Sequence, residues 1–327
     1  MITIILSGGI GSRFWPLSTK ESPKQFLKIF NGNSLFDLTL NRVKNIKNNK
    51  VLTITNSSYS TILKEYKDVT PIYEPMGRNT FGAFLLTIKY LLANNLEKEP
   101  LVFLPSDHMI LDTENFQRDL ANSIKIVEEQ DIMLVLGVKP TYAETGYGYI
   151  KVSRIIDKEK YLYGVKGFIE KPKEELAQYY IKLGGYYWNC GIVVTTVKAF
   201  LNELRLFKPE IHDKLISLSY EQFVEEFKDL PNIPVEEAIL EKSRAIAMIE
   251  ARFDWSDLGS WHTYFNFINK NSPELISLNS NNNNILSTKR TILIDIDDIT
   301  VIESENGLLI MRNGSDQKLK KALRKKI

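Results

Sequence analysis

The stretch Leu6-Ser7-Gly8-Gly9-Ile10-Gly11-Ser12-Arg13 follows directly on a strand-like apolar run that begins at Met1, and it decides the fold. Its glycines lack a Cβ, so the backbone N–H groups of such a loop can close in on an anion. A glycine loop placed directly after a strand therefore predicts a phosphate-binding loop. A tight structural turn is the competing interpretation of the same residues.

The loop matches neither of two common glycine motifs. No Gly-Lys-Ser/Thr follows it, which excludes the P-loop of ATPases. Phe14 stands where the dinucleotide fingerprint has its third glycine, and Asn56 stands where an acid would follow the second strand, so an NAD-dependent enzyme is disfavoured. Arg13 and Lys24 add two cations that suit a triphosphate whose pyrophosphate leaves with negative charge building on it. Ordinary surface charge is the alternative for either cation taken singly.

Beyond the loop, short apolar, β-branched runs alternate with amphipathic helical stretches through most of the chain. This alternation is the pattern of a parallel sheet covered by helices on both faces, and it predicts an α/β layered domain. The expected strands are Thr3–Leu6, Val51–Thr55, Pro71–Tyr73, Leu101–Leu104, Ile132–Gly137, Tyr149–Val152, Gly164–Glu170 and Ile192–Thr195. The expected helices are Thr80–Asn94, Glu114–Gln130, Lys173–Leu183 and Glu236–Ser243.

The composition changes near residue 275, where Asn279 to Asn284 holds five Asn and one Ser. We interpret this stretch as a linker to a small β appendage, so the expected domains are residues 1–270 and 271–327. The basic stretch Lys318–Lys326 is interpreted as a solvated helix rather than a binding tail. The short strands expected in the appendage are Thr291–Ile294, Ile299–Glu303 and Leu308–Met311.

Composition excludes several classes of partner. The 327 residues carry 42 Lys and Arg against 40 Asp and Glu, and a formal net charge of +2 gives no electrostatic case for a nucleic acid or an anionic membrane. Cys190 is the only cysteine and there are three histidines, which leaves no disulfide framework and little material for a zinc site. With no signal-peptide pattern and no apolar run of about 20 residues, we expect a cytoplasmic protein.

Two acidic segments suit a metal ion. An apolar strand from Leu101 leads into Pro105-Ser106-Asp107-His108, and because ligands of open α/β sheets bind at the carboxyl ends of strands, Asp107 is expected near the glycine loop. A hard carboxylate there suits Mg²⁺ bound to triphosphate oxygens, and Asp257 is the candidate for a second ligand. The alternative for Asp107 is a helix N-cap or a turn position, and the alternative for Asp257 is capping of the following helix. His108, Trp255 and Trp261 are expected to be structural.

Three further segments suit a sugar phosphate, because carboxylates, amides and close backbone recognise hydroxyl groups and a lysine suits the phosphate. Each segment taken alone is more often an ordinary turn than a binding site. Cys190 is interpreted as a small packing residue, since no His and acid accompany it. The segments are Glu144-Thr145-Gly146-Tyr147-Gly148-Tyr149, Phe168-Ile169-Glu170-Lys171-Pro172 and Tyr187-Trp188-Asn189-Cys190-Gly191.

Taken in this order, the motifs resemble the sugar-nucleotide pyrophosphorylases, specifically those of the bacterial mannose-1-phosphate guanylyltransferase type. The resemblance covers about residues 1–265. It departs from the family at Phe81-Gly82-Ala83, where Ala-Pro-Ala is usual, and at Cys190, where Ser is common. The matching segments are Gly8-Gly9, Arg13–Leu17, Pro23–Leu27, Glu74-Pro75, Arg78–Thr80, Leu104–His108, Gly146–Ile150, Glu170–Pro172, Trp188-Asn189 and Trp255–Asp257.

The resemblance implies a Rossmann-like, GT-A-type nucleotidyltransferase domain with a mixed, mainly parallel sheet and a short left-handed β-helix-like tail. It implies transfer from GTP to mannose 1-phosphate, with Arg13 and Lys24 as catalytic cations and Mg²⁺ on Asp107 and Asp257. The implied nucleotide-binding residues are Leu6, Gly8, Gly9, Gly11, Ser12, Arg13, Arg78, Asn79, Thr80 and Ser106. Those implied for the sugar phosphate are Gly146, Tyr147, Glu170, Lys171 and Asn189.

Other functions compatible with the sequence are the same reaction on another sugar 1-phosphate, such as a manno-heptose 1-phosphate, or with another nucleotide. A protein of a different class would be a non-catalytic regulator that binds a sugar nucleotide. The presence of Arg13, Lys24, Asp107 and Asp257 together disfavours that class, because a pure binder needs neither a metal nor cations for a leaving group. Edge strands in the tail favour a homodimer.

Overall fold

The computed structural model describes residues 1–9, 11–268 and 275–323. Ile10 of the glycine loop, the expected domain boundary at 270/271 and the end of the basic tail therefore lie outside the described residues. The chain divides into two compact units. The first, called the sheet unit, comprises Met1–Gly8, Thr39–Ser106 and Ile110–Trp255; the second, called the tail unit, comprises Gly9–Leu38, Asp107–Met109 and Ser256–Ile327.

A nine-stranded sheet organises the sheet unit, with the order β3-β2-β1-β4-β8-β5-β9-β7-β6. Strands β3, β2, β1 and β4 run parallel, whereas β8 runs antiparallel to β4 and β5, which confirms the expectation of a mixed sheet. The parallel strands are nearly continuous apolar runs because helices cover both faces of such a sheet. The strands are β1 Ile2–Leu6, β2 Lys50–Asn56, β3 Val69–Glu74, β4 Leu101–Pro105, β5 Met133–Val138, β6 Tyr149–Asp157, β7 Leu162–Ile169, β8 Tyr186–Thr195 and β9 Ile246–Glu250.

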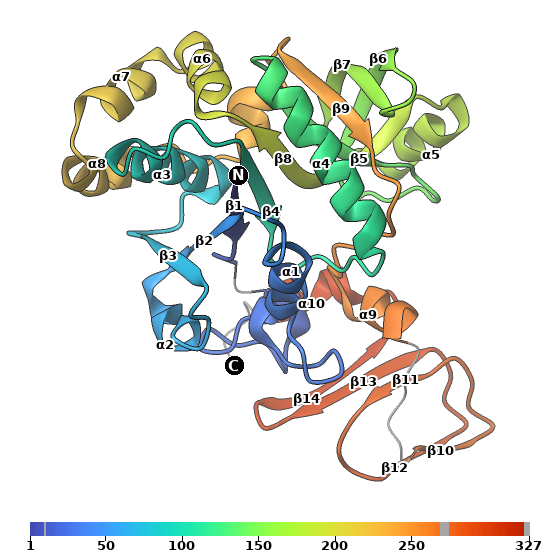
Figure 1. Cartoon of the computed structure of the whole chain (residues 1–327). Coiled ribbons are helices and arrows are strands. Elements are labelled where there is room, and N and C mark those ends of the chain that lie inside the picture. The colour runs from blue at the N-terminus through green and yellow to red at the C-terminus, as the bar shows by residue number, and fades with distance from the viewer. Residues whose placement is uncertain (10, 269–274, 324–327) are drawn as a thin grey trace. The chain divides into compact units, whose positions relative to one another are not determined.

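Helix α3 (Asn79–Ala93) is the most buried of the sheet unit's helices, and its Phe84 ring stacks on Phe103 of β4. Helices α7 and α8 contact α3, and α6 contacts α7 (Figure 1). Within residues 1–9, 11–268 and 275–323, every helix is too short or too polar to span a bilayer. The other helices of this unit are α2 Ser60–Leu63, α4 Thr113–Glu129, α5 Glu174–Leu183, α6 Val197–Phe207, α7 Pro209–Ser217 and α8 Tyr220–Glu226.

The expected elements of the sheet unit are confirmed except for one helix, and the structure adds β9 and the helices α2, α6, α7 and α8. The helix predicted over Glu236–Ser243 is wrong in type, because the chain forms a short π-helical turn at Glu236–Leu240. Strand β9 was not predicted, because its five-residue apolar run is too short for periodicity to separate a strand from a buried helix segment. The eight predicted strands all correspond to strands of the sheet.

An aromatic cluster forms the core of the tail unit. The ring of Phe14 packs 4.6 Å from that of Trp261, the first residue of α9 (Trp261–Ile268). The Trp261 indole N–H donates to the Trp15 carbonyl at 3.0 Å, and the Trp261 backbone N–H donates to Asp316 of α10 (Asp316–Leu323) at 2.7 Å. Trp261, itself held by Asp316, therefore fixes the turn that follows the glycine loop. The expectation that Trp261 is a packing residue is confirmed.

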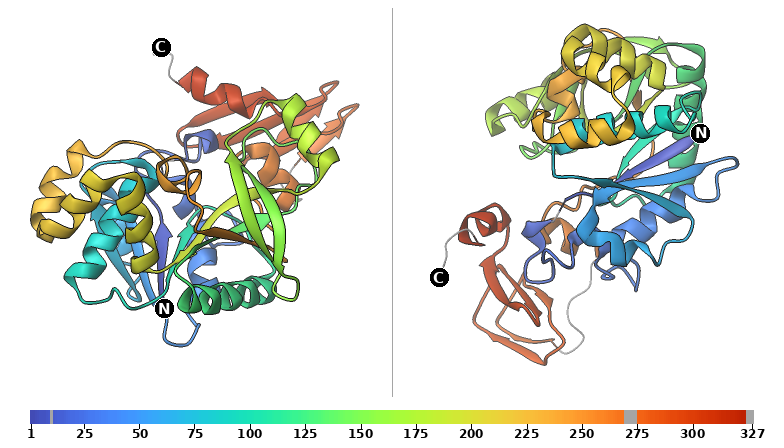
Figure 2. Two further views of the ribbon diagram at one scale, coloured as in Figure 1. Left: turned by 90° about the horizontal axis from the view of Figure 1, so that it is seen from above. Right: turned by 90° about the vertical axis from the view of Figure 1, so that its left-hand side faces the viewer.

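The end of the tail unit is a region of short parallel strands that repeats every 16 residues, since Leu275 pairs with Thr291 and Asn284 with Thr300. The side chain of Asn282 donates to Asp298 at 2.6 Å, so the Asn-rich stretch is part of this region and the prediction of a linker there is wrong. Figure 2 shows these strands in orange and red, followed by α10. They are β10 Leu275–Leu278, β11 Asn284–Leu286, β12 Thr291–Ile294 and β13 Ile299–Ser304; β14 Gly307–Arg312 follows and pairs antiparallel with β13.

Candidate active site

The described part of the glycine loop in the tail unit has its carbonyl groups occupied. The Gly9 carbonyl accepts a hydrogen bond from the Gln25 side chain at 2.8 Å, and the Gly11 carbonyl accepts one from the Ser18 hydroxyl at 2.8 Å. Gly11 has φ 67°, and a Cβ there would lie 2.2 Å from Cβ of Lys24, so both conformation and space require glycine. The hydrogen bonds to these two carbonyl groups hold the loop in its conformation.

The donors of the same loop are available to a ligand. No protein acceptor is found, among the described residues, for the backbone N–H groups of Gly9, Gly11, Ser12 and Arg13. The Arg13 guanidinium, which is half-buried on the 3-10 turn Ser12–Phe14, also has no hydrogen-bond or ion-pair partner in the described chain. Backbone N–H groups beside an uncommitted guanidinium suit an anion with several oxygens.

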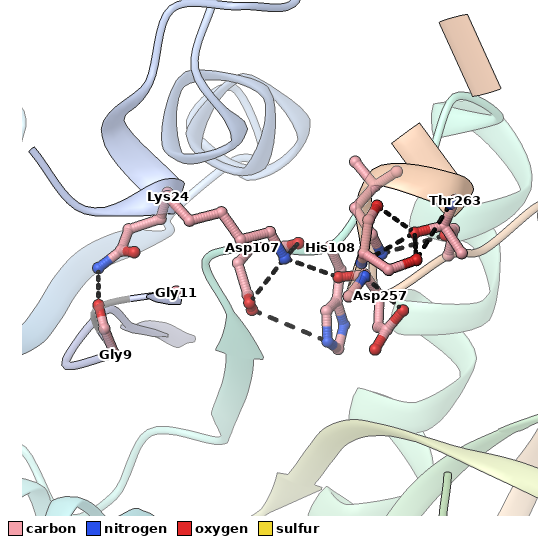
Figure 3. A network of polar contacts seen from close by, with 12 residues as sticks. Gly9, Gly11, Lys24, Asp107, His108, Asp257 and Thr263 are labelled. Atoms are coloured by element: carbon pink, nitrogen blue, oxygen red, sulfur yellow. Dashed lines mark hydrogen bonds and ion pairs between the residues drawn. The ribbon is translucent and has the colours of Figure 1, made fainter. Parts of the chain in front are cut away.

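Lys24 joins the two candidate metal ligands. Its buried ammonium donates to the Asp107 carboxylate at 3.1 Å, to the Asp107 carbonyl at 3.3 Å and to the Asp257 carbonyl at 2.8 Å (Figure 3). The same ammonium lies 5.2 Å from the centroid of the Phe14 ring. These three acceptors use all three N–H bonds of the ammonium. One cation therefore ties together chain segments that are far apart in sequence.

Asp107 and Asp257 lie next to each other because a backbone bridge joins their segments. Met109 and Ser256 exchange N–H···O bonds of 2.9 and 3.0 Å. Neither acid caps a helix. Asp112 caps α4, and Ser260, directly before α9, exchanges hydrogen bonds with Thr263 in the first turn of that helix. The helix-cap interpretation of Asp107 and Asp257 is thus wrong.

The electrostatics keep the Asp107 carboxyl ionised. Burial alone raises its pKa, but the Lys24 and His108 charges and the Lys24 hydrogen bond outweigh burial and hold the pKa below its ordinary value. The side chain remains 42% exposed. One Asp257 carboxylate oxygen accepts the Gly259 N–H at 2.8 Å.

The donor set of this site fits one class of metal. The described residues hold no group of three His, Cys, Asp or Glu side chains that could bind a metal ion, which disfavours a zinc-type site. Two carboxylates fit Mg²⁺, which keeps waters and takes phosphate oxygens as its remaining ligands.

In the sheet unit, the residues expected to bind a sugar phosphate lie together where β6 begins and β7 ends, beside the interior of β8. The Asn189 N–H of β8 donates to the Gly148 carbonyl at 2.8 Å, just before β6. A Cβ on Gly148 would lie 2.7 Å from a carboxylate oxygen of Glu170, directly after β7. Lys171 forms an ion pair with Glu170. The structure thus brings Glu170, Lys171 and Asn189 into one cluster.

The Gly146-Tyr147 turn supports this cluster from the side. The Gly146 N–H donates to the Glu144 carboxylate at 2.7 Å, and a Cβ on Gly146 would lie 2.9 Å from that oxygen. The Tyr147 ring is buried and packs edge-on against Trp188 and Trp255, with centroid distances of 5.3 and 5.0 Å. Tyr147 and Trp255 therefore hold the turn by packing.

The segment Arg78-Asn79-Thr80 forms the start of α3. The Asn79 side chain accepts the Thr80 N–H at 2.8 Å, and the Arg78 guanidinium donates to the carbonyls of Phe227 and Lys228. A Cβ on Gly82 would lie 2.4 Å from Cβ of Arg78, so the unusual glycine accommodates the packing of Arg78. This departure from the family pattern is explained by helix packing.

Two residues of the sheet unit were given no role from sequence. Glu74, at the end of β3, is buried, and burial raises the pKa of its carboxyl to about 7. A Cβ on Gly8 would lie 2.8 Å from a Glu74 carboxylate oxygen, so the glycine admits this carboxyl. Glu236, on the π-helical turn, accepts a hydrogen bond from Asn189 at 3.3 Å. Glu74 belongs to the segment Glu74-Pro75 that matches the family, so the sequence carried a signal for it. Glu236 lies in no matching segment and is identified only by its contacts in the fold.

The remaining expected residues have structural surroundings. Leu6 ends β1 and the buried Ser106 directly follows the neighbouring strand β4, and the Ser106 N–H donates to the Leu6 carbonyl at 3.0 Å. Cys190 is fully buried, its thiol donates to the Leu136 carbonyl at 3.1 Å, and burial raises its pKa to about 12. The interpretation of Cys190 as a packing residue is confirmed.

The two candidate cations should differ in their effect on stability. Replacing Lys24 by Met leaves the partly buried acceptors of Asp107 and Asp257 without this donor, and we expect the change to lower the free energy of unfolding by about 1–3 kcal/mol. Arg13→Met removes no hydrogen bond or ion pair of the described chain, so the expected change stays within about 0.5 kcal/mol. Urea unfolding of both variants measures this difference. Equal losses in the two variants would contradict the bonding described for Lys24.

Comparison with known proteins gives consistent matches. The model of the family described as nucleotidyl transferase matches residues 2–273. The chain is 30% identical to mannose-1-phosphate guanylyltransferase 2 of Escherichia coli O157:H7, over 98% of this chain and 72% of that protein. It is 32% identical to the alginate biosynthesis protein AlgA of Pseudomonas syringae pv. tomato, over 98% of this chain and 70% of that protein. A solved structure described as mannose-1-phosphate geranyltransferase of Thermus thermophilus superposes with a TM-score of 0.86 at 26% identity, covering 99% of this chain and 98% of that one.

Proposed function

Since the chain belongs to the nucleotidyl transferase family and has the Rossmann-like α/β fold with a mixed sheet, we propose that it transfers the guanylyl group of GTP to mannose 1-phosphate. The products are GDP-mannose and pyrophosphate. Similarity to mannose-1-phosphate guanylyltransferases over nearly the whole chain supports this choice of sugar and nucleotide. The chain is accordingly an enzyme, a nucleotidyltransferase.

The observation that carries the proposal is the arrangement of Lys24, Asp107 and Asp257 beside Arg13, whose guanidinium has no partner in the described chain. In the reaction, a phosphate oxygen of mannose 1-phosphate attacks the α-phosphorus of GTP in line with the departing pyrophosphate. The attacking phosphate is already ionised, so no general base is required. The work of the protein is to position the two substrates and to offset negative charge.

We assign Arg13 and the N–H groups of Gly9, Gly11 and Ser12 to the triphosphate. Lys24 holds Asp107 and Asp257 together and adds positive charge at the same place. Asp107 and Asp257 would hold Mg²⁺, which when bound neutralises charge on phosphate oxygens. The lowered pKa of Asp107 supports a metal-binding role, because the ligand must be ionised.

For the nucleobase we propose Glu74, with Leu6, Gly8, Ser106 and the segment Arg78-Asn79-Thr80 contributing to the nucleotide site. Guanine presents two neighbouring donors, N1–H and the N2 amino group, and an ionised carboxylate is an acceptor at both oxygens. Adenine has no such pair of donors. The close approach of the Glu74 carboxylate to the backbone of Gly8 supports this role.

For the sugar phosphate we propose the cluster of Glu170, Lys171 and Asn189, with Gly146 and the buried Tyr147 shaping the turn beside it. Carboxylate and amide groups match the hydroxyl groups of a hexose, and the half-exposed Lys171 matches its phosphate. A different sugar 1-phosphate, such as a manno-heptose 1-phosphate, would use the same groups with different hydroxyl partners.

Several finer assignments belong to the same proposal. The 16-residue repeat supports a short left-handed β-helix in the tail unit, and the edge strands of that region support a homodimer. We propose residues 1–270 as the nucleotidyltransferase domain, residues 271–327 as the appendage, and the cytoplasm as the location. The product would be a precursor of a polysaccharide or glycan.

Release of pyrophosphate tests the function directly. With Mg²⁺ and mannose 1-phosphate, we expect the purified protein to release pyrophosphate with GTP and at least about 100-fold more slowly with ATP, CTP or UTP, because a site built to bond the base rejects bases that leave its polar groups without partners. Release with another nucleotide at the rate seen with GTP would overturn the choice of base. No release with any nucleotide would overturn the proposed function.

Replacing Arg13 by Ala should reduce kcat by roughly 100-fold or more, by analogy with the loss of one pre-organised donor to a developing charge. Because Arg13 has no intramolecular partner in the described chain, the variant should stay folded, and steady-state kinetics can be compared directly with wild type. Lys28→Ala is a matched control from the exposed surface nearby. Turnover of Arg13→Ala within a factor of three of wild type would exclude a catalytic role.

Glu74 makes the use of GTP dependent on pH. Its folded-state pKa of about 7 lies above the ordinary value of 4.5, so the carboxylate becomes the main form only as pH rises above 7. We expect the KM for GTP to fall by about 10-fold between pH 6 and pH 8, and Glu74→Gln to lose both this dependence and the preference for GTP over ATP. An unchanged pH profile in Glu74→Gln would remove Glu74 from base recognition.

A further inference from the structure

Glu236 occupies an unusual backbone position in the sheet unit. It is the first residue of the π-helical turn Glu236–Leu240, in which the Glu241 N–H donates to the Glu236 carbonyl at 2.9 Å. Single π turns are rare and are concentrated at functional sites. The side chain keeps some access to solvent, yet burial and the nearby Glu170 charge raise the pKa of its carboxyl. Glu236 therefore lies near Glu170 in the cluster proposed for the sugar phosphate.

The carboxylate of Glu236 sets the orientation of the Asn189 amide. Oδ1 of Asn189 accepts the Gly191 N–H at 3.1 Å, and Nδ2 donates to Oε1 of Glu236 at 3.3 Å. With an acceptor on one side and a donor on the other, the amide cannot exchange its oxygen and nitrogen without losing both bonds. The second N–H of Nδ2 has no acceptor among the residues that the structure describes.

The other oxygen of Glu236 faces the start of α3. The Thr80 hydroxyl lies 3.5 Å from Oε2 of Glu236, and Thr80 Oγ1 accepts the Val235 N–H at 2.9 Å. Thr80 thus fixes the backbone that leads into the π-helical turn, and Glu236 has one partner on each oxygen. The carboxylate is held from both sides in the direction that Asn189 requires.

We propose that Glu236 is a positioning residue for the sugar 1-phosphate, and that it acts by directing the uncommitted N–H of Asn189 at a hydroxyl oxygen of the sugar. This inference rests on the proposed function of the cluster. A carboxylate suits the task because it only accepts hydrogen bonds, so the amide must present its nitrogen and not its oxygen. Glu236 itself need not touch the sugar.

Kinetics of four variants test the role: Glu236→Ala, Glu236→Gln, Asn189→Ala and the double variant Glu236→Ala with Asn189→Ala. Glu236→Ala should raise the KM for mannose 1-phosphate about 10-fold, corresponding to one hydrogen bond, and change the KM for GTP less than about 2-fold. Glu236→Gln keeps an acceptor and should stay within about 3-fold of wild type. Because Glu236 acts through Asn189, the double variant should match Asn189→Ala. Glu237→Ala, an exposed acid on the same turn, is the control.

Several outcomes would overturn the proposal. They are additive effects in the double variant, equal losses for both substrates, wild-type kinetics in Glu236→Ala, or a Glu236→Gln variant as impaired as Glu236→Ala. If Glu236→Ala does not fold, Glu236→Leu, which also removes the acceptor but fills the space of the side chain, replaces it in the cycle. Failure of the proposed function shows separately, as no pyrophosphate release by wild type. Calorimetric binding of mannose 1-phosphate then decides, and equal affinity of wild type and the acceptor-free Glu236 variant, or binding by neither, overturns the role.

Discussion

The hydrogen bonds from the Lys24 ammonium to Asp107 and Asp257 are the interaction on which the proposed triphosphate and metal site of the tail unit depends. A buried ammonium is costly unless all of its donors are satisfied, and here three oxygens satisfy them. The same bonds draw two acids that are far apart in sequence into one place. The ammonium pairs with the Asp107 carboxylate and bonds the backbone carbonyl of Asp257, so it holds the Asp257 segment without neutralising its side chain.

This arrangement determines the neighbouring glycine loop as well. Gly11 has to be glycine because the Lys24 side chain occupies the space of a Cβ. The aromatic contact between Phe14 and Trp261 anchors the turn after the loop, so that Arg13 stands on a fixed support while its guanidinium stays uncommitted within the described chain. Electrostatic stabilisation of a departing phosphate requires a cation that is held in place by a rigid backbone and is not already paired.

In the proposed function, the sheet unit recognises the hydroxyl groups of the sugar and the base. Its polar residues are Glu74 and Glu170 at strand ends, Asn189 within β8 and Glu236 on the π-helical turn, and burial raises the pKa of Glu74 and of Glu236. Carboxyl groups in such surroundings gain from a ligand that brings hydrogen-bond donors. The tail unit carries Arg13 and Lys24, which are proposed for the triphosphate, and the sheet unit carries these acceptors together with Lys171, which is proposed for the sugar phosphate.

The sequence by itself determined the α/β class, the eight predicted strands and the identity of the glycine loop, because apolar periodicity and glycine placement are local properties of the chain. It also singled out Arg13, Lys24, Asp107 and Asp257 as residue types that suit a triphosphate and a metal. Only the tertiary structure decided that Lys24 bonds to both acid segments, that Gly82 makes room for Arg78, and that Glu236 orients Asn189. These are contacts between residues distant in sequence, and no local pattern specifies which partner a polar side chain will meet once the chain has folded.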